Sequence, residues 1–484
     1  MNPDGKKPMP SVVVNESLPG PEIRVREGDS FRAAVQNELG DGPTSIHWHG
    51  LLVPAGMDGV PDISTTPIPP GQVYVYEYPI RQSGTYWYHS HVGFQEQVGC
   101  FGPFIIEPRE EPLHADHDAV VMLSDWLHRS PEEVYAELRG EPSPGSGKAF
   151  QGKSSGMSGM TGGAMPSAAP TFGGKSGMSG MQGMDMGGAA MPVLSASAGA
   201  VKPAMGEQPA GMAGMAMKGA ADLSDVKYNA FLLNGKAADA PWTLAARPGE
   251  RIRLRIINAA ASTYFQVRLD DHPLQVTHAD GLAVEPVTVD HLLMGMAESY
   301  DVVVSLGKPG SYTLHAVAQD GSGQAIGVLH TPDAKPQPNR AMPTFTGKAL
   351  DYAALRAPAS TVLPAGPKRS FRLPLQGDMA KYVWMIDGQV WPNADPLEIR
   401  QGDRVELELV NQTMMWHPMH LHGHFFRVLQ GAGDHCPLKH TVNVAPGQAV
   451  KIEFGADNPG RWFFHCHNVY HLEAGMAREF IYRV

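Results

Sequence analysis

The stretch "APGQAVKIEFGADNPGRWFFHCH" (445–467) decides the fold. It begins with a turn, continues as an alternating apolar–polar segment, turns again at a Pro-Gly pair and ends in an aromatic-rich segment. Period-two alternation bounded by Gly and Pro predicts β-strands. The same plan appears in "PPGQVYVYEYPIRQSGTYWYHSH" (69–91) and "MGMAESYDVVVSLGKPGSYTLHAVA" (294–318), so the chain contains three tandem repeats.

A second set of similar segments precedes the first set, once in each repeat. These segments are "EIRVREGDSFRAAVQN" (22–37), "TLAARPGERIRLRIIN" (243–258) and "EIRQGDRVELELVN" (398–411). Only "SPEEVYAELRG" (130–140) has the pattern of a short helix. We therefore predict an all-β fold of three tandem Greek-key β-sandwich domains. The predicted boundaries are 1–112, 113–340 and 341–484.

Residues 141–221 interrupt the second repeat. They are rich in Gly, Ala, Ser, Pro and Met and have few charges and almost no β-branched or aromatic residues. Such a composition cannot build a packed core. We predict a flexible, Met- and Gly-rich insertion in the second domain.

The bulk composition narrows the class of partner. The formal net charge is −11 and no run of Lys or Arg stands out, which argues against nucleic acid. No stretch is long and apolar enough to span a bilayer. Three cysteines cannot make a disulfide framework, whereas 21 histidines and 25 methionines make metal ligands the first candidates.

Eleven of the histidines fall in four clusters, two in the first repeat and two in the third. The clusters are "HWHG" (47–50), "YHSH" (88–91), "HPMHLHGH" (417–424) and "HCHNVYH" (465–471). On a strand, residues i and i+2 point to the same face about 6.6–7 Å apart, so a His-x-His pair presents two imidazoles to one side. One pair is weak evidence, because a solvated strand edge shows it by chance. Four pairs at corresponding ends of two repeats predict a metal cluster shared by the first and third domains.

Cys466 lies between two of these histidines and points to the opposite face of the strand. We expect its partners to be His417 and His471, with Met476 further along the chain. A Cys with two His and a distant thioether is the blue-copper ligand set, suited to one-electron transfer. The spacing therefore predicts an electron-transfer copper joined to a multi-histidine cluster by a Cys–His peptide over about 10 Å.

With these four motifs the chain resembles the three-domain multicopper oxidases, and most closely their bacterial copper-resistance branch. The likeness covers nearly the whole chain outside the insertion. It implies cupredoxin-like domains and four copper ions, one of type 1, one of type 2 and two of type 3. The ligands implied for type 1 copper are His417, Cys466, His471 and Met476, and those for type 2 are His47 and His420. The ligands implied for one type 3 copper are His49, His89 and His467, and those for the other are His91, His422 and His465.

The resemblance also implies an activity. A donor gives single electrons to the type 1 copper, they pass along Cys466 to His465 and His467, and four of them reduce O₂ to two waters. Relatives of this kind are usually monomers, and copper-resistance oxidases act in the periplasm or are otherwise exported. The chain opens "MNPDGKKPMP" without an apolar signal segment, which is compatible with a trimmed mature form and leaves export neither shown nor excluded.

The reduction of O₂ consumes protons, and the family's proton donor matches Asp58 in "MDGVPD". Ordinary turn chemistry explains this Asp-Gly pair equally well. Some relatives carry a second acid just before the last type 1 histidine, where this chain has Tyr470. A phenol with a pKa of about 10 is a poor acid at neutral pH, so the second relay is in doubt.

Twelve of the 25 methionines lie within residues 157–217, several as Met-x-x-Met pairs. Thioethers are soft and select Cu(I), although methionine in a flexible segment can also be inert filler. The candidate Cu(I) ligands are Met157, Met160, Met178, Met181, Met184, Met186, Met212, Met215 and Met217. Met476 as an axial ligand should hold the type 1 potential down and favour easily oxidised donors.

The leading hypothesis is an oxidase of Cu(I), and of phenolic and aromatic amine donors, with a role in copper tolerance. One alternative is a general laccase whose Met-rich linker does nothing, and another is a copper-sequestering protein. A copper nitrite reductase is disfavoured, because it has no use for the six type 3 histidines. Cys100 and Cys436 remain open between a bridge and two buried free thiols.

Overall fold

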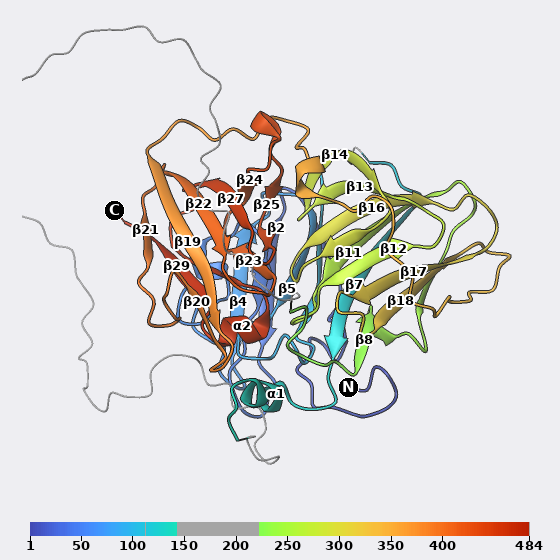
Figure 1. The fold of residues 1–484 in the computed structure, drawn as a ribbon, viewed down its shortest axis with the longest axis horizontal. Helices are drawn as coiled ribbons and strands as arrows, with labels where there is room; N and C mark the ends of the chain where they lie inside the picture. Colours follow the sequence, from blue (N-terminus) through green and yellow to red (C-terminus); the bar gives the residue numbers. More distant parts are fainter. Residues whose placement is uncertain (112, 143–221, 484) are drawn as a thin grey trace, which may run out of the picture. The chain divides into compact units, whose positions relative to one another are not determined.

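The computed structural model describes residues 1–111, 113–142 and 222–483 (Figure 1). The predicted insertion therefore lies outside the described residues except for Glu141 and Pro142, and so do its candidate Cu(I) ligands.

The first repeat has two sheets. One has the strand order β1-β6-β5-β3 and the other pairs β2 with β4. The bounds are β1 Ile23–Arg26, β2 Ser30–Gln36, β3 His47–His49, β4 Val73–Pro79, β5 Gly84–His89 and β6 Phe101–Glu107.

The middle repeat has a seven-stranded sheet, β14-β13-β16-β11-β7-β8-β9, and a five-stranded sheet, β10-β18-β17-β12-β15. The first half is β7 His117–Trp126, β8 Ala230–Leu233, β9 Lys236–Ala237, β10 Trp242–Ala245, β11 Arg251–Asn258 and β12 Phe265–Leu269. The second half is β13 Leu274–Ala279, β14 Leu282–Val289, β15 Leu292–Met294, β16 Ser299–Ser305, β17 Ser311–Ala318 and β18 Gln324–His330.

The third repeat has a six-stranded sheet, β20-β19-β22-β27-β24-β25, and a five-stranded sheet, β21-β29-β28-β23-β26. The first six strands are β19 Lys368–Asp378, β20 Val383–Ile386, β21 Leu397–Ile399, β22 Arg404–Asn411, β23 His417–Leu421 and β24 Phe426–Val428. The others are β25 Leu438–Lys439, β26 Thr441–Val444, β27 Ala449–Gly455, β28 Arg461–Cys466 and β29 Ala477–Tyr482.

Helices are few and short. The predicted helix is α1, Pro131–Leu138, which begins where the Ser130 hydroxyl accepts a hydrogen bond from the Glu133 N–H, a standard N-cap. A second helix, α2, Val469–Glu473, was not predicted, and the Asn468 side chain caps it. Single 3₁₀ turns are η1 Ala55–Met57, η2 Tyr352–Ala354 and η3 Gly433–His435.

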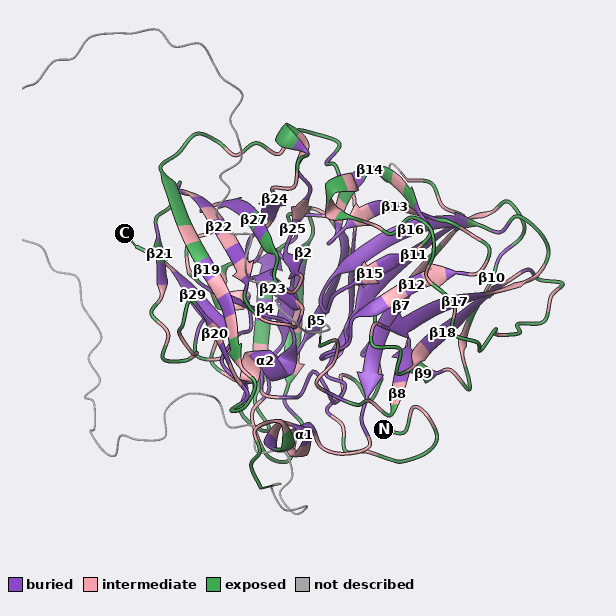
Figure 2. Cartoon of the chain, in the orientation of Figure 1, coloured by how far each residue is buried: buried purple, intermediate pink, exposed green. Residues whose placement is uncertain are grey.

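Burial explains why some strands alternate and others do not. In β22 every second residue is buried, as expected for a strand with one solvent-facing side. Strand β5 is buried throughout (Figure 2), and β28 is buried from Trp462 onward, because the second faces of both strands also pack against protein. These two aromatic-rich strands carry or adjoin two of the four His-x-His pairs, His89/His91 and His465/His467, so these histidines lie deep in the molecule.

The first and third repeats share one apolar core, which includes Trp48 and Phe104 from the first and Trp384 and Phe464 from the third. The middle repeat has its own main core, separate from the shared one, around Leu254. Figure 1 shows the blue strands of the first repeat beside the orange and red strands of the third. The predicted all-β, three-repeat fold is confirmed, while its boundaries at 112/113 and 340/341 stay predictions.

Candidate metal centres

Two antiparallel strand pairs bring the histidines together. In the first repeat β3 pairs with β5, and His47 lies opposite His89. In the third repeat β23 pairs with β28, and His420 lies opposite His465. Each ladder therefore presents imidazoles from two neighbouring strands to one face.

The two ladders meet face to face. The rings of His47 and His422 are 4.0 Å apart between centroids, and those of His49 and His420 are stacked at 3.8 Å. Contacts of this kind join the first repeat to the third. They place the predicted cluster between these two repeats, with no ligand from the middle repeat among the groups formed by the described residues.

Within this cluster the side chains form three groups whose ligand atoms lie within 4.8 Å of one another. The groups are His47, His49 and His420; His49, His89 and His467; and His91, His422 and His465. The second and third have the same members as the two predicted type 3 sets, and the first contains the predicted type 2 pair. The structure thus brings the predicted side chains together, while their role as copper ligands stays a prediction.

The chemistry of these rings fits a cation. Five Nε2 atoms are buried and have no hydrogen-bond partner among the described residues, which costs about 1–3 kcal/mol for each atom left unsatisfied. They belong to His47, His49, His91, His420 and His467. Metal ions bound in these groups would accept the five lone pairs.

The same rings are held neutral, as metal ligands must be. Burial, followed by the neighbouring imidazoles, lowers the pKa of six of them well below the usual 6.5. They are His49, His89, His91, His420, His422 and His467. Burial also lowers the pKa of His465 to about 3.

Hydrogen bonds at the backs of the rings fix which nitrogen faces the cluster. The carbonyl oxygen of Asp58 lies 2.7 Å from Nδ1 of His47, and that of His440 lies 2.8 Å from Nδ1 of His420. A carbonyl can only accept, so Nδ1 carries the proton and Nε2 keeps its lone pair.

A further group lies on the other side of strand β28. The Sγ of Cys466 is 3.7 Å from Nδ1 of His417 and 3.6 Å from Nδ1 of His471. Met476 is fully buried, and its carbonyl oxygen accepts a hydrogen bond from the Cys466 N–H at 3.0 Å. The alternation predicted for this strand is therefore present, with the thiol on one face and the flanking imidazoles on the other.

Comparison with known proteins identifies the family. Three models described as multicopper oxidase match residues 1–111, 208–334 and 365–484. The multicopper oxidase MmcO of Mycobacterium tuberculosis is 35% identical over 98% of this chain and 83% of its own. The chain belongs to the multicopper oxidase family.

Two further comparisons refine this result. The copper resistance protein A homologue of Pseudomonas syringae pv. tomato is 32% identical to this multicopper oxidase, over 97% of this chain and 88% of its own. Among solved structures Fet3p, described as a multicopper oxidase that functions in iron import, covers 100% of this chain and 88% of its own, with a TM-score of 0.76 at 20% identity. The second likeness shows the fold alone. The predicted family, branch and enzyme class are confirmed, and copper is the cofactor of the family.

In this oxidase Asp58 does more than shape a turn. It ends the 3₁₀ turn η1, and its buried carboxylate lies 3.0 Å from Nδ1 of His422 and 3.3 Å from Nδ1 of His47. The turn interpretation and the site interpretation of Asp58 are therefore compatible.

Sequence reasoning missed Glu96, which lies on the opposite side of the cluster. Its Oε2 is 2.7 Å from Nδ1 of His89, and its Oε1 is 3.8 Å from Nδ1 of His467. Burial, followed by the charge of Asp125, raises the pKa of the Glu96 carboxyl well above its usual range. Its place five residues after His91 was the only sequence signal.

Sequence reasoning also missed the surroundings of His471. Its Nε2 lies 3.1 Å from Oδ2 of Asp225, which accepts a second hydrogen bond from the Tyr382 hydroxyl at 2.7 Å. The side chain of Asp225 is only 3% exposed, and the Trp384 ring lies 3.9 Å from the His471 ring. Residues far apart in the sequence therefore enclose the outer edge of this histidine.

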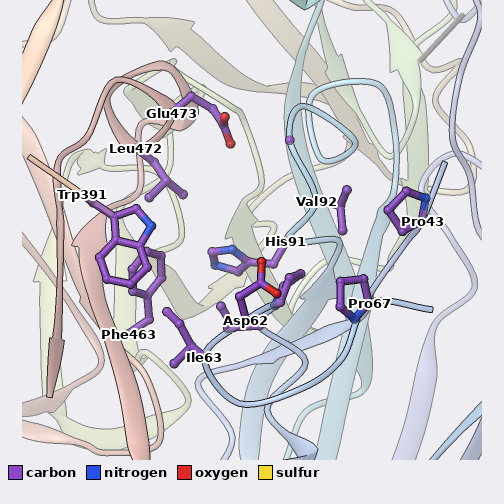
Figure 3. Close-up of a pocket in the computed structure, with 13 residues that line it drawn as sticks. Pro43, Asp62, Ile63, Pro67, His91, Val92, Trp391, Phe463, Leu472 and Glu473 are labelled. Carbon is purple, nitrogen blue, oxygen red and sulfur yellow. The ribbon is translucent and has the colours of Figure 1, made fainter. Parts of the chain in front are cut away.

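A cavity leads toward the cluster between the first and third repeats. Its wall includes His91, Asp62, Trp391, Phe463 and Glu473 (Figure 3). A smaller adjoining cavity is lined by His89, Glu96, His465 and His467, and Glu473 and His91 line both. His91 and Glu473 therefore lie where the two cavities adjoin, beside the histidine cluster.

The carboxyl near His471 belongs to Glu473, whereas residue 470 is a tyrosine. Tyr470 is buried, and its hydroxyl donates a hydrogen bond to Gln97 at 3.3 Å. Burial, followed by the charge of Glu132, raises the pKa of Glu473 to about 7, so this carboxyl is about half protonated at neutral pH. The acid was expected at the position immediately before His471, whereas the Glu473 carboxyl lies two residues after His471.

Two remaining questions from the sequence concern the other cysteines and membrane-spanning segments. Cys100 and Cys436 are both free and buried, so they form no bridge. No helix among the described residues combines the length and the hydropathy needed to cross a membrane.

Proposed function

We propose that this multicopper oxidase takes single electrons from Cu(I), and from phenolic and aromatic amine donors, and uses four of them to reduce O₂ to water. The observation that carries the proposal is strand β28, where Cys466 and its two flanking histidines face different ligand groups. One peptide segment thus connects an electron-accepting site to an oxygen-reducing site.

The ligand sets follow from the groups described above. His417, Cys466, His471 and Met476 would hold type 1 copper, and His47 and His420 type 2 copper. His49, His89 and His467 would hold one type 3 copper, and His91, His422 and His465 the other. Bound copper would supply one-electron transfer at the first site and four-electron reduction of O₂ at the other three.

The chain's own residues would orient the ligands and supply protons. Asp58 and the His440 carbonyl hold imidazole protons at Nδ1, which leaves Nε2 free for a metal. Glu473 lines both cavities beside the cluster and is about half protonated at neutral pH, so it is positioned to exchange protons with the oxygen site. Asp58 is the second candidate donor.

The Cu(I) part of the proposal is supported by the chain that follows the Met-rich segment. The N–H of Asp222 donates a hydrogen bond to the Met414 carbonyl at 3.0 Å, and Asp225 lies against His471. Met217 lies five residues before Asp222, a reach of at most about 17 Å in an extended chain. Soft thioethers can thus be tethered close to the predicted electron-accepting site. Such a role in copper tolerance is consistent with a periplasmic or otherwise exported monomer.

The test of the proposal is oxygen uptake by the purified, copper-loaded chain. We expect four copper ions per chain, a strong blue absorption, and one O₂ consumed for every four Cu(I) supplied. No O₂ uptake with Cu(I) would contradict the proposal. A copper content well above four with negligible turnover would instead favour the sequestering alternative.

Replacing Asp225 by Asn should separate the two kinds of donor. The amide keeps a hydrogen bond to His471 but loses the charge that attracts a cation, so kcat/KM for Cu(I) should fall about tenfold, and that for a neutral phenol by less than about twofold. Steady-state O₂ uptake with each donor measures this. Asp222→Asn, three residues earlier and exposed, is the matched control. An equal loss for both donors would show that Asp225 does not select the cation.

A further inference from the structure

Glu96 differs from most buried carboxylates of this protein in what surrounds it. Its side chain is 6% exposed, no Lys or Arg of the described residues pairs with it, and its Oε1 has no hydrogen-bond donor. An anion in such surroundings is costly unless a positive charge lies nearby. Its neighbours are instead the two rings of His89 and His467, both from the same ligand group.

Other buried acids show how the protein normally satisfies such a group. Asp125 accepts hydrogen bonds from the Thr263 hydroxyl, two backbone N–H groups and the Gln97 amide. Asp301 pairs with Arg253 at 2.6 Å. Glu298 pairs with Lys439 at 3.0 Å. Glu96 has neither kind of partner, so in its ionised form it needs a positive charge bound beyond the imidazoles.

The loop that carries Glu96 is firmly held, so its position is not accidental. Gln95, next to it, accepts hydrogen bonds from the hydroxyls of Thr44 and Ser90, both at 2.7 Å, and its amide donates to the Pro43 carbonyl at 2.8 Å. These bonds fix the chain between His91 and β6. They hold the Glu96 carboxylate against Nδ1 of His89.

The cluster has a corresponding arrangement on its other side. There the Asp58 carboxylate lies behind His422, in the group with His91 and His465, and Asp58 also lacks a Lys or Arg partner among the described residues. Each of the two three-histidine groups thus has one buried carboxylate from the first repeat on the side away from the metal position.

We infer that Glu96 is a positioning residue that holds copper in the His49–His89–His467 group, by fixing His89 with Nδ1 protonated and by supplying a negative charge to that group. This inference rests on the proposed ligand set. A carboxylate on the outer N–H of a ligating histidine orients the ring and increases the basicity of its other nitrogen. Removing such a partner typically weakens metal binding 10–100-fold.

Glu96→Gln tests the charge separately from the hydrogen bond. The amide oxygen can still accept from His89 Nδ1, so the ring stays oriented while the charge is lost. The protein is titrated with a competing copper chelator. We expect the chelator concentration that removes half of one copper to be about 10–100-fold lower for Glu96→Gln than for the unmodified chain. Copper content should drop from four toward three, and the blue absorption of Cys466 should be unchanged.

Electron paramagnetic resonance identifies which copper is lost. Two type 3 ions are coupled and silent, so losing one of them makes its former partner visible, and the visible fraction of copper should rise. Glu453→Gln is the control, because Glu453 is equally buried but pairs with Arg404 and Arg427 in the third repeat. The control should retain four coppers.

The outcomes distinguish the two proposals. If Glu96→Gln keeps four coppers at the same chelator concentration as the unmodified chain, the inference is wrong and the proposed function stands. If the unmodified chain itself shows no coupled copper pair, the proposed ligand set is wrong. If blue absorption and coupled copper are lost together in Glu96→Gln, the residue acts on the whole fold and the inference is also wrong.

Discussion

Cys466→Ser should abolish the blue absorption of the oxidase and lower O₂ uptake with every donor by more than about 100-fold. Changing only the hydrogen-bond partner of a metal ligand lowers activity or metal affinity by up to about 100-fold, and loss of the ligand itself should cost more. The thiolate is the one soft anionic ligand of its group, and a serine hydroxyl does not replace it. The histidine groups are untouched, so three coppers should remain. Metal analysis, visible absorption and an oxygen electrode measure the three quantities.

Cys436→Ser is the matched control for this change. Cys436 is also a buried free thiol, and its Sγ–H donates to the Gly433 carbonyl at 3.1 Å, a bond that a serine hydroxyl can also make. This variant should keep its blue absorption and its turnover. Substantial O₂ uptake by Cys466→Ser would show that electrons reach the histidine cluster without passing this residue.

Much of this site could be predicted from sequence because strand geometry is regular. Alternation alone places His465 and His467 on one face of β28 and Cys466 on the other, and the structure has that arrangement. The repeats also indicated that the first and third domains would meet at the histidines. What local pattern could not give was the exact pairing of β3 with β5 and of β23 with β28, which places His47 against His422.

The residues that sequence reasoning missed are those that reach the site through packing. Asp225 lies in the loop that precedes β8, and Tyr382 lies in the turn before β20. Their side chains meet beside His471. Glu473 was missed because α2 was not predicted: a helical turn after His471 directs its carboxyl to the cavity. A lone Asp or Glu has no signature in the sequence until tertiary contacts give it a neighbour.

Removing residues 143–221 should have the largest effect on donor preference. If the Met-rich segment captures Cu(I), its loss should lower kcat/KM for Cu(I) by about tenfold or more, because the tethered thioethers no longer raise the local concentration of the ion. Oxidation of a phenol should at least be retained, because Asp225, Tyr382 and Trp384, which enclose His471, stay in place. Pro142 and Asp222 would be joined by a short Gly-Ser linker, and O₂ uptake would be measured with both donors.

A chain of equal length in which the nine candidate methionines named above are replaced by Leu is the control for this deletion. It keeps the bulk of the segment and removes the thioethers, so it should lose Cu(I) oxidation without any gain for phenols. If both variants oxidise Cu(I) as fast as the unmodified chain, the methionines play no part in turnover. The general laccase alternative would then be correct, and Asp225 beside His471 would remain the one feature of the described chain that favours a cationic donor.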